Sequence, residues 1–173
     1  FAELVPAALA TMPEALRVRL NIVQQCRAEQ ADSLRQTYAT LGMDAEVAAF
    51  FSDMPDRLAA SDLVIARAGA STVAELAAAG RPALLVPFAG AMDDHQTANA
   101  RQLEAAGGGQ CLAESDLDAA CLGPAIADIL SDPDRRQRMG RAARSLAATD
   151  AASIIAEHAL MLAGITKRTG SGS

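Results

Sequence analysis

Short apolar runs alternate along the chain with longer segments in which hydrophobic residues recur at helical spacing. Near-continuous apolar runs are typical of strands that are buried on both faces of a parallel sheet. The expected strands are residues 19–25, 46–51, 63–66, 83–86 and 109–112. The expected helices between them are residues 2–11, 28–41, 55–60, 72–79 and 95–106. This alternation favours a doubly wound α/β domain with helices on both faces of the sheet.

The pattern becomes wholly helical after residue 114. Further helices are expected at residues 117–130, 133–147 and 150–162, where they either close one side of the sheet or extend away from it. Glycines follow several expected helices, at Gly42, Gly80 and Gly107, where a left-handed residue commonly ends a helix. The chain has 173 residues, enough for one domain. We therefore expect one domain at residues 1–163, followed by a Gly- and Ser-rich tail at 164–173.

Composition narrows the function classes. Hydrophobic residues make up 51% of the chain, which excludes a disordered protein. The net charge of −6 leaves no broad basic surface, so nucleic acid is not an expected partner. No apolar run approaches the roughly 20 residues that span a bilayer, and a cytoplasmic protein is expected. Cys26, Cys111 and Cys121 are far apart and outside any C-x-x-C spacing, so we expect buried, unpaired thiols.

A turn of small residues follows the expected strand 63–66. It contains Arg67, Ala68, Gly69, Ala70, Ser71, Thr72, Val73, Ala74 and Glu75. Gly69 and Ala70 let a ligand approach the backbone, and the free N–H groups at the start of the next helix form an anion site that suits a diphosphate. Glu75, one turn later, could accept hydrogen bonds from a ribose. Thr72 and Glu75 also match the capping box S/T-x-x-E, which needs no ligand, and the two interpretations are compatible.

A second polar group follows the expected strand 83–86. Asp93, Asp94, His95, Gln96 and Asn99 gather at a strand-to-helix junction, with His95 and Asn99 on one helical face. Many directed donors and acceptors suit the hydroxyls of a sugar. The alternative is that one of the two aspartates caps the helix above a solvated first turn. One histidine beside aspartates lacks the spacing of a metal site, so no metal is expected.

Two other features allow two interpretations each. Phe50 and Phe51 end the expected strand 46–51, where an aromatic ring either packs on a nucleobase or staples the short helix that follows. A basic helical run either touches anionic lipid or forms a solvated face, and we favour the solvated face. The run consists of Arg135, Arg136, Arg138, Arg141 and Arg144.

Taken together, three segments resemble the C-terminal domain of the MurG family of bacterial glycosyltransferases. They are residues 51–54, residues 60–88 with the run from Arg67 to Glu75, and residues 94–100 with Asp94-His95-Gln96. The resemblance covers roughly residues 1–163. It implies a Rossmann-like sheet that forms the C-terminal half of a GT-B enzyme, with the nucleotide sugar held mainly by this half. The implied reaction transfers GlcNAc from UDP-GlcNAc to the C4 hydroxyl of MurNAc in lipid I, which gives lipid II for peptidoglycan at the cytoplasmic face of the inner membrane.

The resemblance also implies roles for single residues. Phe51 would border the uracil, residues 70–75 would hold the diphosphate with Glu75 on the ribose, and His95 and Gln96 would bind the GlcNAc hydroxyls. The expected UDP-GlcNAc site comprises Phe51, Arg67, Gly69, Ala70, Ser71, Thr72, Val73, Ala74, Glu75, His95, Gln96 and Asn99. No cofactor other than this donor substrate is expected.

The resemblance leaves part of such an enzyme outside the chain. Phe1 opens directly into an expected helix, without the strand and glycine-rich turn that begin a doubly wound nucleotide-binding unit. Lipid I binding, membrane contact and the general base would belong to the N-terminal domain, so we expect no catalytic residue here and no activity from this chain alone. Two alternatives stay open: the donor domain of another GT-B enzyme, such as a lipid glucosyltransferase or a nucleotide-sugar epimerase, or a non-catalytic nucleotide-sugar-binding fragment.

Overall fold

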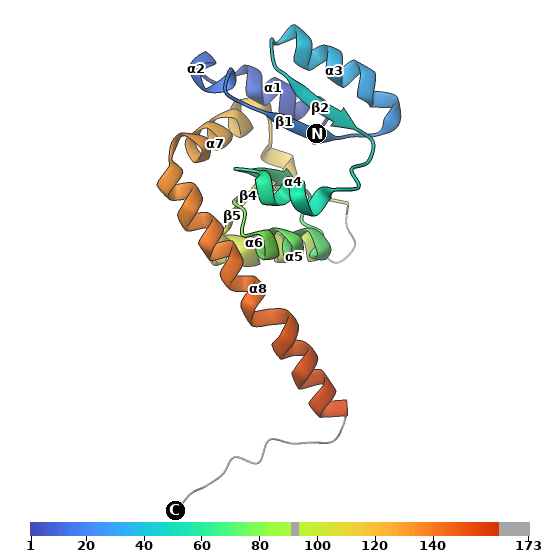
Figure 1. The fold of residues 1–173 in the computed structure, drawn as a ribbon, viewed down its shortest axis with the longest axis vertical. Coiled ribbons are helices and arrows are strands. Elements are labelled where there is room, and N and C mark those ends of the chain that lie inside the picture. Colours follow the sequence, from blue (N-terminus) through green and yellow to red (C-terminus); the bar gives the residue numbers. More distant parts are fainter. Residues whose placement is uncertain (91–93, 163–173) are drawn as a thin grey trace, which may run out of the picture.

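The protein is an α/β structure with parallel sheets (Figure 1). The computed structural model describes residues 1–90 and 94–162, and for residues 148–162 the backbone alone. In the first sheet, β1 (Ile22–Gln25) pairs with β2 (Ala45–Ala48). In the second, β4 (Ala83–Leu85) lies between β3 (Val64–Ala66) and β5 (Gly109–Cys111), and every pairing is parallel. The expected parallel architecture is confirmed, with the described strands divided between two sheets because β1 and β3 do not pair.

All five expected strands are present, and each is shorter than predicted. The first begins at Ile22 rather than at residue 19, because the N–H groups of Arg19 and Leu20 donate to carbonyls of the preceding helical turn. The second ends at Ala48, before the two phenylalanines. Both trimmed ends leave polar or aromatic residues in loops instead of in the sheet.

The helices agree with the pattern, with three exceptions. They are α1 (Leu4–Ala10), α2 (Glu14–Arg17), η1 (Ala28–Gln30), α3 (Ala31–Thr40), α4 (Met54–Ala60), α5 (Ala70–Ala79), α6 (His95–Ala105), η3 (Glu114–Asp116), α7 (Ala119–Ser131) and α8 (Pro133–Leu162). The short helices α2 and η3 were not expected. The expected break between residues 147 and 150 is wrong: α8 is continuous, since neither Gly nor Pro occurs from residue 141 to 162.

Helices cover both faces of the second sheet. Leu84 on β4 is fully buried and belongs to a core cluster formed with α1, α3 and α7. Its neighbours Ala83 and Leu85 are also fully buried but belong to a second cluster, formed with α5 and α6. Figure 1 shows α5 and α6 beside each other on one side of β4 and α1 and α7 on the other. Alternate residues of one strand therefore face two helical layers, as in a doubly wound domain.

Glycines shape the joints between these layers. Gly42, Gly80 and Gly107 have φ angles of 67°, 63° and 83°, which confirms the expected left-handed residues after three helices. Gly80 serves a second purpose, because α8 crosses the turn that follows α5. A Cβ atom on Gly140 would lie 2.6 Å from the carbonyl oxygen of Gly80, so only glycine lets α8 approach this closely.

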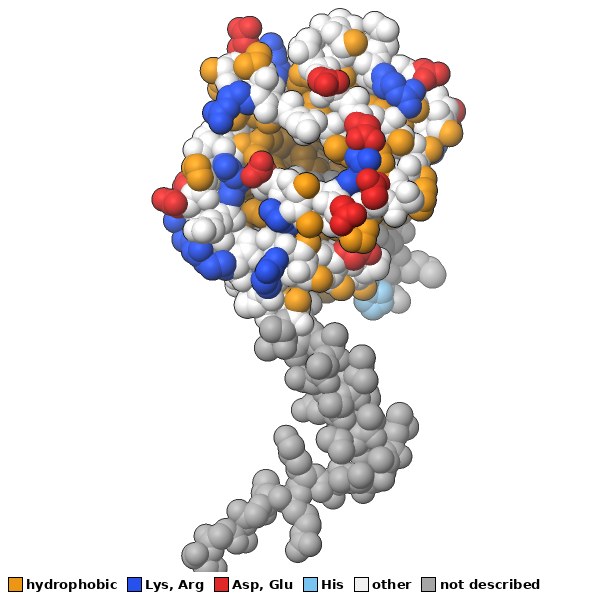
Figure 2. Space-filling model, in the orientation of Figure 1, with side chains coloured by type: hydrophobic (Ala, Val, Ile, Leu, Met, Phe, Trp, Pro, Cys, Tyr) orange, Lys and Arg blue, Asp and Glu red, His pale blue; other side chains and the backbone are white. Residues whose placement is uncertain are grey.

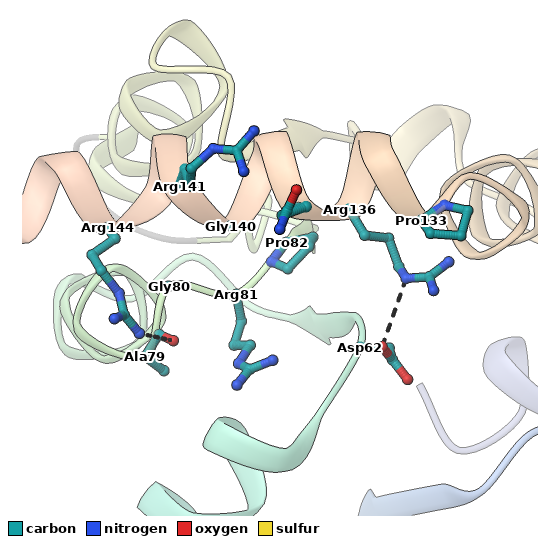
Figure 3. A pocket seen from close by; sticks show the side chains of 11 residues that line it. Asp62, Ala79, Gly80, Arg81, Pro82, Pro133, Arg136, Gly140, Arg141 and Arg144 are labelled. Atoms are coloured by element: carbon teal, nitrogen blue, oxygen red, sulfur yellow. Dashed lines mark hydrogen bonds and ion pairs between the residues drawn. The ribbon is translucent and has the colours of Figure 1, made fainter.

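Arginines gather at the amino ends of the strands, where α4, α5 and α7 end (Figure 3). Arg144 donates to the last carbonyl of α5 at 3.0 Å, and Arg81 donates to carbonyls at the end of α4. Arg136 donates to the carbonyls at the end of α7 and lies 3.6 Å from Asp62. These side chains line a cavity of about 380 Å³. Their donors meet the negative ends of helix dipoles, which accounts for the positive charge at this edge.

The thiols differ from expectation in their burial. Cys26, Cys111 and Cys121 are free, but the first two are half-buried and Cys121 is exposed. The expectation of buried thiols is therefore wrong. None of the described helices is long and apolar enough to cross a membrane.

Because Gly140 contacts Gly80, we expect a Gly→Ala substitution in this helix to destabilise the protein rather than to stabilise it. Gly→Ala inside a helix normally stabilises by about 1 kcal/mol. We expect Gly140→Ala instead to lower the free energy of unfolding by about 1–3 kcal/mol, because the new methyl group meets a backbone carbonyl. Gln137→Ala, exposed on the same helix, should change it by less than about 0.5 kcal/mol. Urea unfolding of both variants tests this, and equal or higher stability of Gly140→Ala would contradict it.

Candidate functional site

The carboxyl ends of β3, β4 and β5 meet at one edge of the second sheet, which brings the loops that follow them together. The loop after β3 leads into α5 within a few residues. Gly69 is extended, with φ of −61° and ψ of 150°, and stands at the N-cap position, so α5 begins at Ala70. The start of α5 is therefore held at the edge where open α/β sheets bind ligands.

No side chain caps α5, and this overturns the capping-box interpretation of Thr72 and Glu75. Thr72 lies inside the first turn, because the N-cap residue is Gly69, which has no side chain that could cap the helix. The first bond of the helix runs from the N–H of Val73 to the carbonyl of Gly69 at 3.0 Å. The N–H groups before Val73 have no partner within the helix, so the first turn of α5 can receive an anion.

The residues of this first turn differ in what they can present to a ligand. Ala70, Ser71 and Ala74 are exposed. Val73 is buried and packs in the core, so only its backbone can contact a ligand. Glu75 is exposed, and its carboxylate makes no hydrogen bond or ion pair with any residue that the structure describes. An unengaged acceptor thus lies one turn from the open N–H groups.

Helix α6 connects the two loops predicted from the sequence. The Nδ2 of Asn99 donates to the carbonyl of Ala68 at 3.0 Å, at the end of β3. The Oε1 of Gln96 accepts the N–H of Phe88 at 2.9 Å, in the loop after β4. The two segments that carry most of the expected site residues are therefore neighbours. His95, exposed at the first position of α6, stands beside them.

The start of α6 is strained. Asp94 stands at the N-cap position with φ of 52°, which in the described chain is the only positive φ of a residue other than glycine. Its side chain makes no capping hydrogen bond, so the proposed capping role of Asp94 is not seen. Asp93, the other aspartate considered, lies outside the described residues. Left-handed backbone at a non-glycine residue costs about 1–3 kcal/mol and is concentrated at functional loops.

The two phenylalanines after β2 lie in different environments. Phe51 is buried, and the guanidinium of Arg57 lies 4.2 Å from the centre of its ring. Arg57 also binds Glu46 and Asp53, and this hydrogen bond holds the pKa of Asp53 below its usual value. The ring of Phe51 therefore packs against α4, as the expected staple would, and the expected contact with a nucleobase stays a prediction. Phe50, by contrast, is exposed.

Sequence reasoning missed Glu114, which is 47 residues from its partner Arg67. The Nη2 of Arg67 lies 2.5 Å from the Oε1 of Glu114, and its Nη1 donates to the carbonyl of Pro87 at 3.3 Å. The other oxygen of Glu114 accepts the N–H of Ala89 at 3.1 Å. Arg67 is the main reason that the pKa of Glu114 is lowered. A signal was available, because Glu114 follows the expected strand 109–112 at the same edge as the other loops.

A cavity of about 320 Å³ opens beside Arg67 and Glu114, and Val86, Gln30 and residues 1–4 also line it. Among the side chains that the structure describes, in residues 1–90 and 94–147, no three of His, Cys, Asp or Glu are grouped so that they could hold a metal ion. The site consists of an open helix start, the carboxylate of Glu75 and amide side chains, which are groups that can bind a polar anion.

Comparison with known families agrees with this geometry. Residues 1–156 match the model of the glycosyltransferase family 28 C-terminal domain. The chain belongs to this family. Most of the described fold lies within the matched residues, including both sheets and the start of α8.

Individual relatives of this family 28 domain are close. The chain is 50% identical over 157 residues to the UDP-N-acetylglucosamine--N-acetylmuramyl-(pentapeptide) pyrophosphoryl-undecaprenol N-acetylglucosamine transferase of Rhodospirillum rubrum, covering 91% of this chain and 41% of that protein. The protein of the same name from Brucella suis is 45% identical over 163 residues, covering 94% and 43%. The chain thus spans less than half the length of the curated relatives it matches.

Solved structures extend the comparison to the fold. Acinetobacter baumannii MurG superposes with a TM-score of 0.80 at 32% identity, covering 91% of this chain and 46% of that one. WaaG, described as a glycosyltransferase involved in lipopolysaccharide biosynthesis, superposes with a TM-score of 0.67 at 24% identity, which shows a shared fold. The family 28 domain is therefore a MurG homologue with the fold of the C-terminal half of GT-B glycosyltransferases.

Proposed function

We propose that this chain is the UDP-GlcNAc-binding domain of an inverting glycosyltransferase that converts lipid I to lipid II in peptidoglycan synthesis. The relatives at 45–50% identity carry the name of that transferase. The observation on which the proposal rests is the uncapped first turn of α5 at the carboxyl edge of the sheet, with the unengaged carboxylate of Glu75 one turn away. An anion cradle beside a free acceptor fits a diphosphate joined to a ribose.

Each expected site residue has a proposed part. The backbone of residues 70–75 holds the diphosphate, and Glu75 accepts hydrogen bonds from the ribose hydroxyls. Gln96 and His95 bind the GlcNAc hydroxyls from the start of α6. Phe51, with its ring buried, borders the uracil, while Arg67, Gly69 and Asn99 shape the loops around the donor.

The proposed reaction divides between this chain and an acceptor domain. The C4 hydroxyl of MurNAc attacks the anomeric carbon of the donor and gives its proton to a base on the acceptor side. The bond to UDP breaks with inversion, and the negative charge that develops on the diphosphate is stabilised by the N–H groups and dipole of α5. Lipid I binding and contact with the cytoplasmic face of the inner membrane belong to the other domain.

Glu75→Ala should weaken UDP-GlcNAc binding about 10- to 100-fold, because hydrogen bonds to a charged group contribute about 1.5–3 kcal/mol. Calorimetric titration with UDP-GlcNAc, UDP-glucose and UDP measures this. UDP should lose as much affinity as UDP-GlcNAc, since both carry the ribose. Glu14→Ala removes another exposed helical glutamate and should leave all three affinities unchanged. Equal binding by wild type and Glu75→Ala would contradict the assignment.

The chain alone should not transfer GlcNAc to lipid I, because the base and the acceptor site are assigned to the other domain and catalysis requires both halves to close. Incubation with lipid I and radiolabelled UDP-GlcNAc tests this, with a complete homologous transferase as the positive control. Lipid II formed by the isolated chain would refute the division of labour.

We also propose that a strand and a glycine-rich turn upstream of Phe1 complete the sheet. In the doubly wound order 3-2-1-4-5-6, the described strands occupy positions 3-2 and 4-5-6, and the open position is the first strand. Ile65 on β3 and Val23 on β1 point their backbone groups away from their partner strands, because alternate residues of a parallel ladder bond to opposite sides. Figure 2 shows a hollow with hydrophobic walls in this region.

A chain that extends upstream of Phe1 should therefore protect the amides of Val23 and Ile65 from hydrogen exchange, because a strand between β1 and β3 would accept both. In the present chain the two amides should exchange quickly. The amide of Val64, which already donates to Pro82 at 3.0 Å, is the internal control and should be protected in both. Unchanged exchange at Ile65 in the longer chain would show that no strand enters there.

A further inference from the structure

The guanidinium of Arg67 is already engaged within the protein. Its Nη2 binds Glu114 at 2.5 Å, and its Nη1 donates to the carbonyls of Val86 and Pro87 at 3.4 and 3.3 Å. The ring of Phe88 lies 5.4 Å away. These partners lie in the segments that follow β4 and β5. Arg67, the first residue after β3, thus joins the loops that follow three strands, and both of its Nη atoms already have partners within the protein.

Glu114 also contacts the loop after β4, to which Val86, Pro87 and Phe88 belong. Its Oε2 accepts the N–H of Ala89 at 3.1 Å, while the preceding N–H, on Phe88, donates to the Oε1 of Gln96 at 2.9 Å. Successive N–H groups of the loop after β4 are therefore held by side chains from two different elements, η3 and α6. A movement of Ala89 would therefore displace the N–H of Phe88 and, through its hydrogen bond, the side chain of Gln96, which the proposed function assigns to the sugar.

We propose that Glu114 is a positioning residue for the sugar half of the donor and that Arg67 acts through it rather than on the diphosphate. This rests on the proposed function, UDP-GlcNAc binding. The carboxylate clamps Arg67 and the N–H of Ala89, and so fixes the loop that sets the direction of Gln96. The cradle for the diphosphate, on α5, has no hydrogen bond to this clamp and should not depend on it.

The two possible roles of Arg67 predict opposite changes in ligand affinity when Glu114 is removed. If Arg67 bound the diphosphate directly, Glu114 would compete for it, and removal of Glu114 would strengthen binding of both UDP and UDP-GlcNAc. If Glu114 is a positioning residue, its removal weakens binding of UDP-GlcNAc and spares UDP. A general loss of stability would weaken binding of both ligands.

The chain contains a matched control for Glu114. Glu104 on α6 also joins an arginine to a backbone amide, with one oxygen 2.5 Å from Arg101 and the other accepting the N–H of Cys111 at 2.9 Å. The exposed fractions of the two glutamate side chains are similar, 33% for Glu104 and 35% for Glu114. Glu104→Ala thus removes the same kinds of contact without touching the loop after β4.

The test is calorimetric titration of the whole chain with UDP-GlcNAc and with UDP. We expect Glu114→Ala to bind UDP-GlcNAc about tenfold more weakly and UDP as before, as is usual when a supporting contact behind a ligand is lost. Glu114→Gln, which keeps an acceptor oxygen, should recover most of the affinity. Glu104→Ala should match wild type for both ligands. Unchanged or tighter binding of UDP-GlcNAc by Glu114→Ala, or equal losses for both ligands, would overturn the proposal.

A second measurement separates failure of this proposal from failure of the proposed function. If wild type binds no UDP-GlcNAc, the proposed function fails. The role of Glu114 in holding the loop after β4 is then tested by hydrogen exchange alone. The amides of Phe88 and Ala89 should be protected in wild type and in Glu104→Ala and exposed in Glu114→Ala. Equal exchange of these amides in all three proteins would show that Glu114 does not hold the loop.

Discussion

The parallel pairing of β3, β4 and β5 is the constraint on which the candidate site depends. Each of these strands contributes only three residues, so few hydrogen bonds hold them together. Burial supplies the rest: Ala83, Leu84 and Leu85 are completely inaccessible, and helices pack on both of their faces. Because the strands are fixed in parallel, the loops that follow them all lie at one edge of the sheet.

The two edges of this sheet have opposite electrostatic character, and both follow from the same helix direction. Each crossover helix runs against the strands, so helix starts lie at the carboxyl edge and helix ends at the amino edge. At the amino edge, arginines from α8 and from the turn before β4 neutralise the carbonyls that end α4, α5 and α7 (Figure 3). At the carboxyl edge, the N–H groups at the start of α5 have no such partner.

Local patterns predicted the elements well because each depends on neighbouring residues. The apolar runs located all five strands, and Gly42, Gly80 and Gly107 marked three helix ends. Thr72 misled because its spacing to Glu75 fits a capping box, whereas the helix begins before Thr72, with the extended Gly69 at its N-cap position. Glu114 was missed because its partner lies 47 residues away, and only the pairing of strands brings the two together.

The close approach of α8 to the turn after α5 has a consequence for reading sequences of this family. Gly140 lies at the amino edge of the sheet, away from the candidate site, yet a larger residue there would collide with the carbonyl of Gly80. An invariant glycine at such a place is easily mistaken for a sign of catalysis or binding. Here the restriction is purely steric, so substitutions at position 140 should be limited by the geometry of two crossing segments and not by what the protein binds.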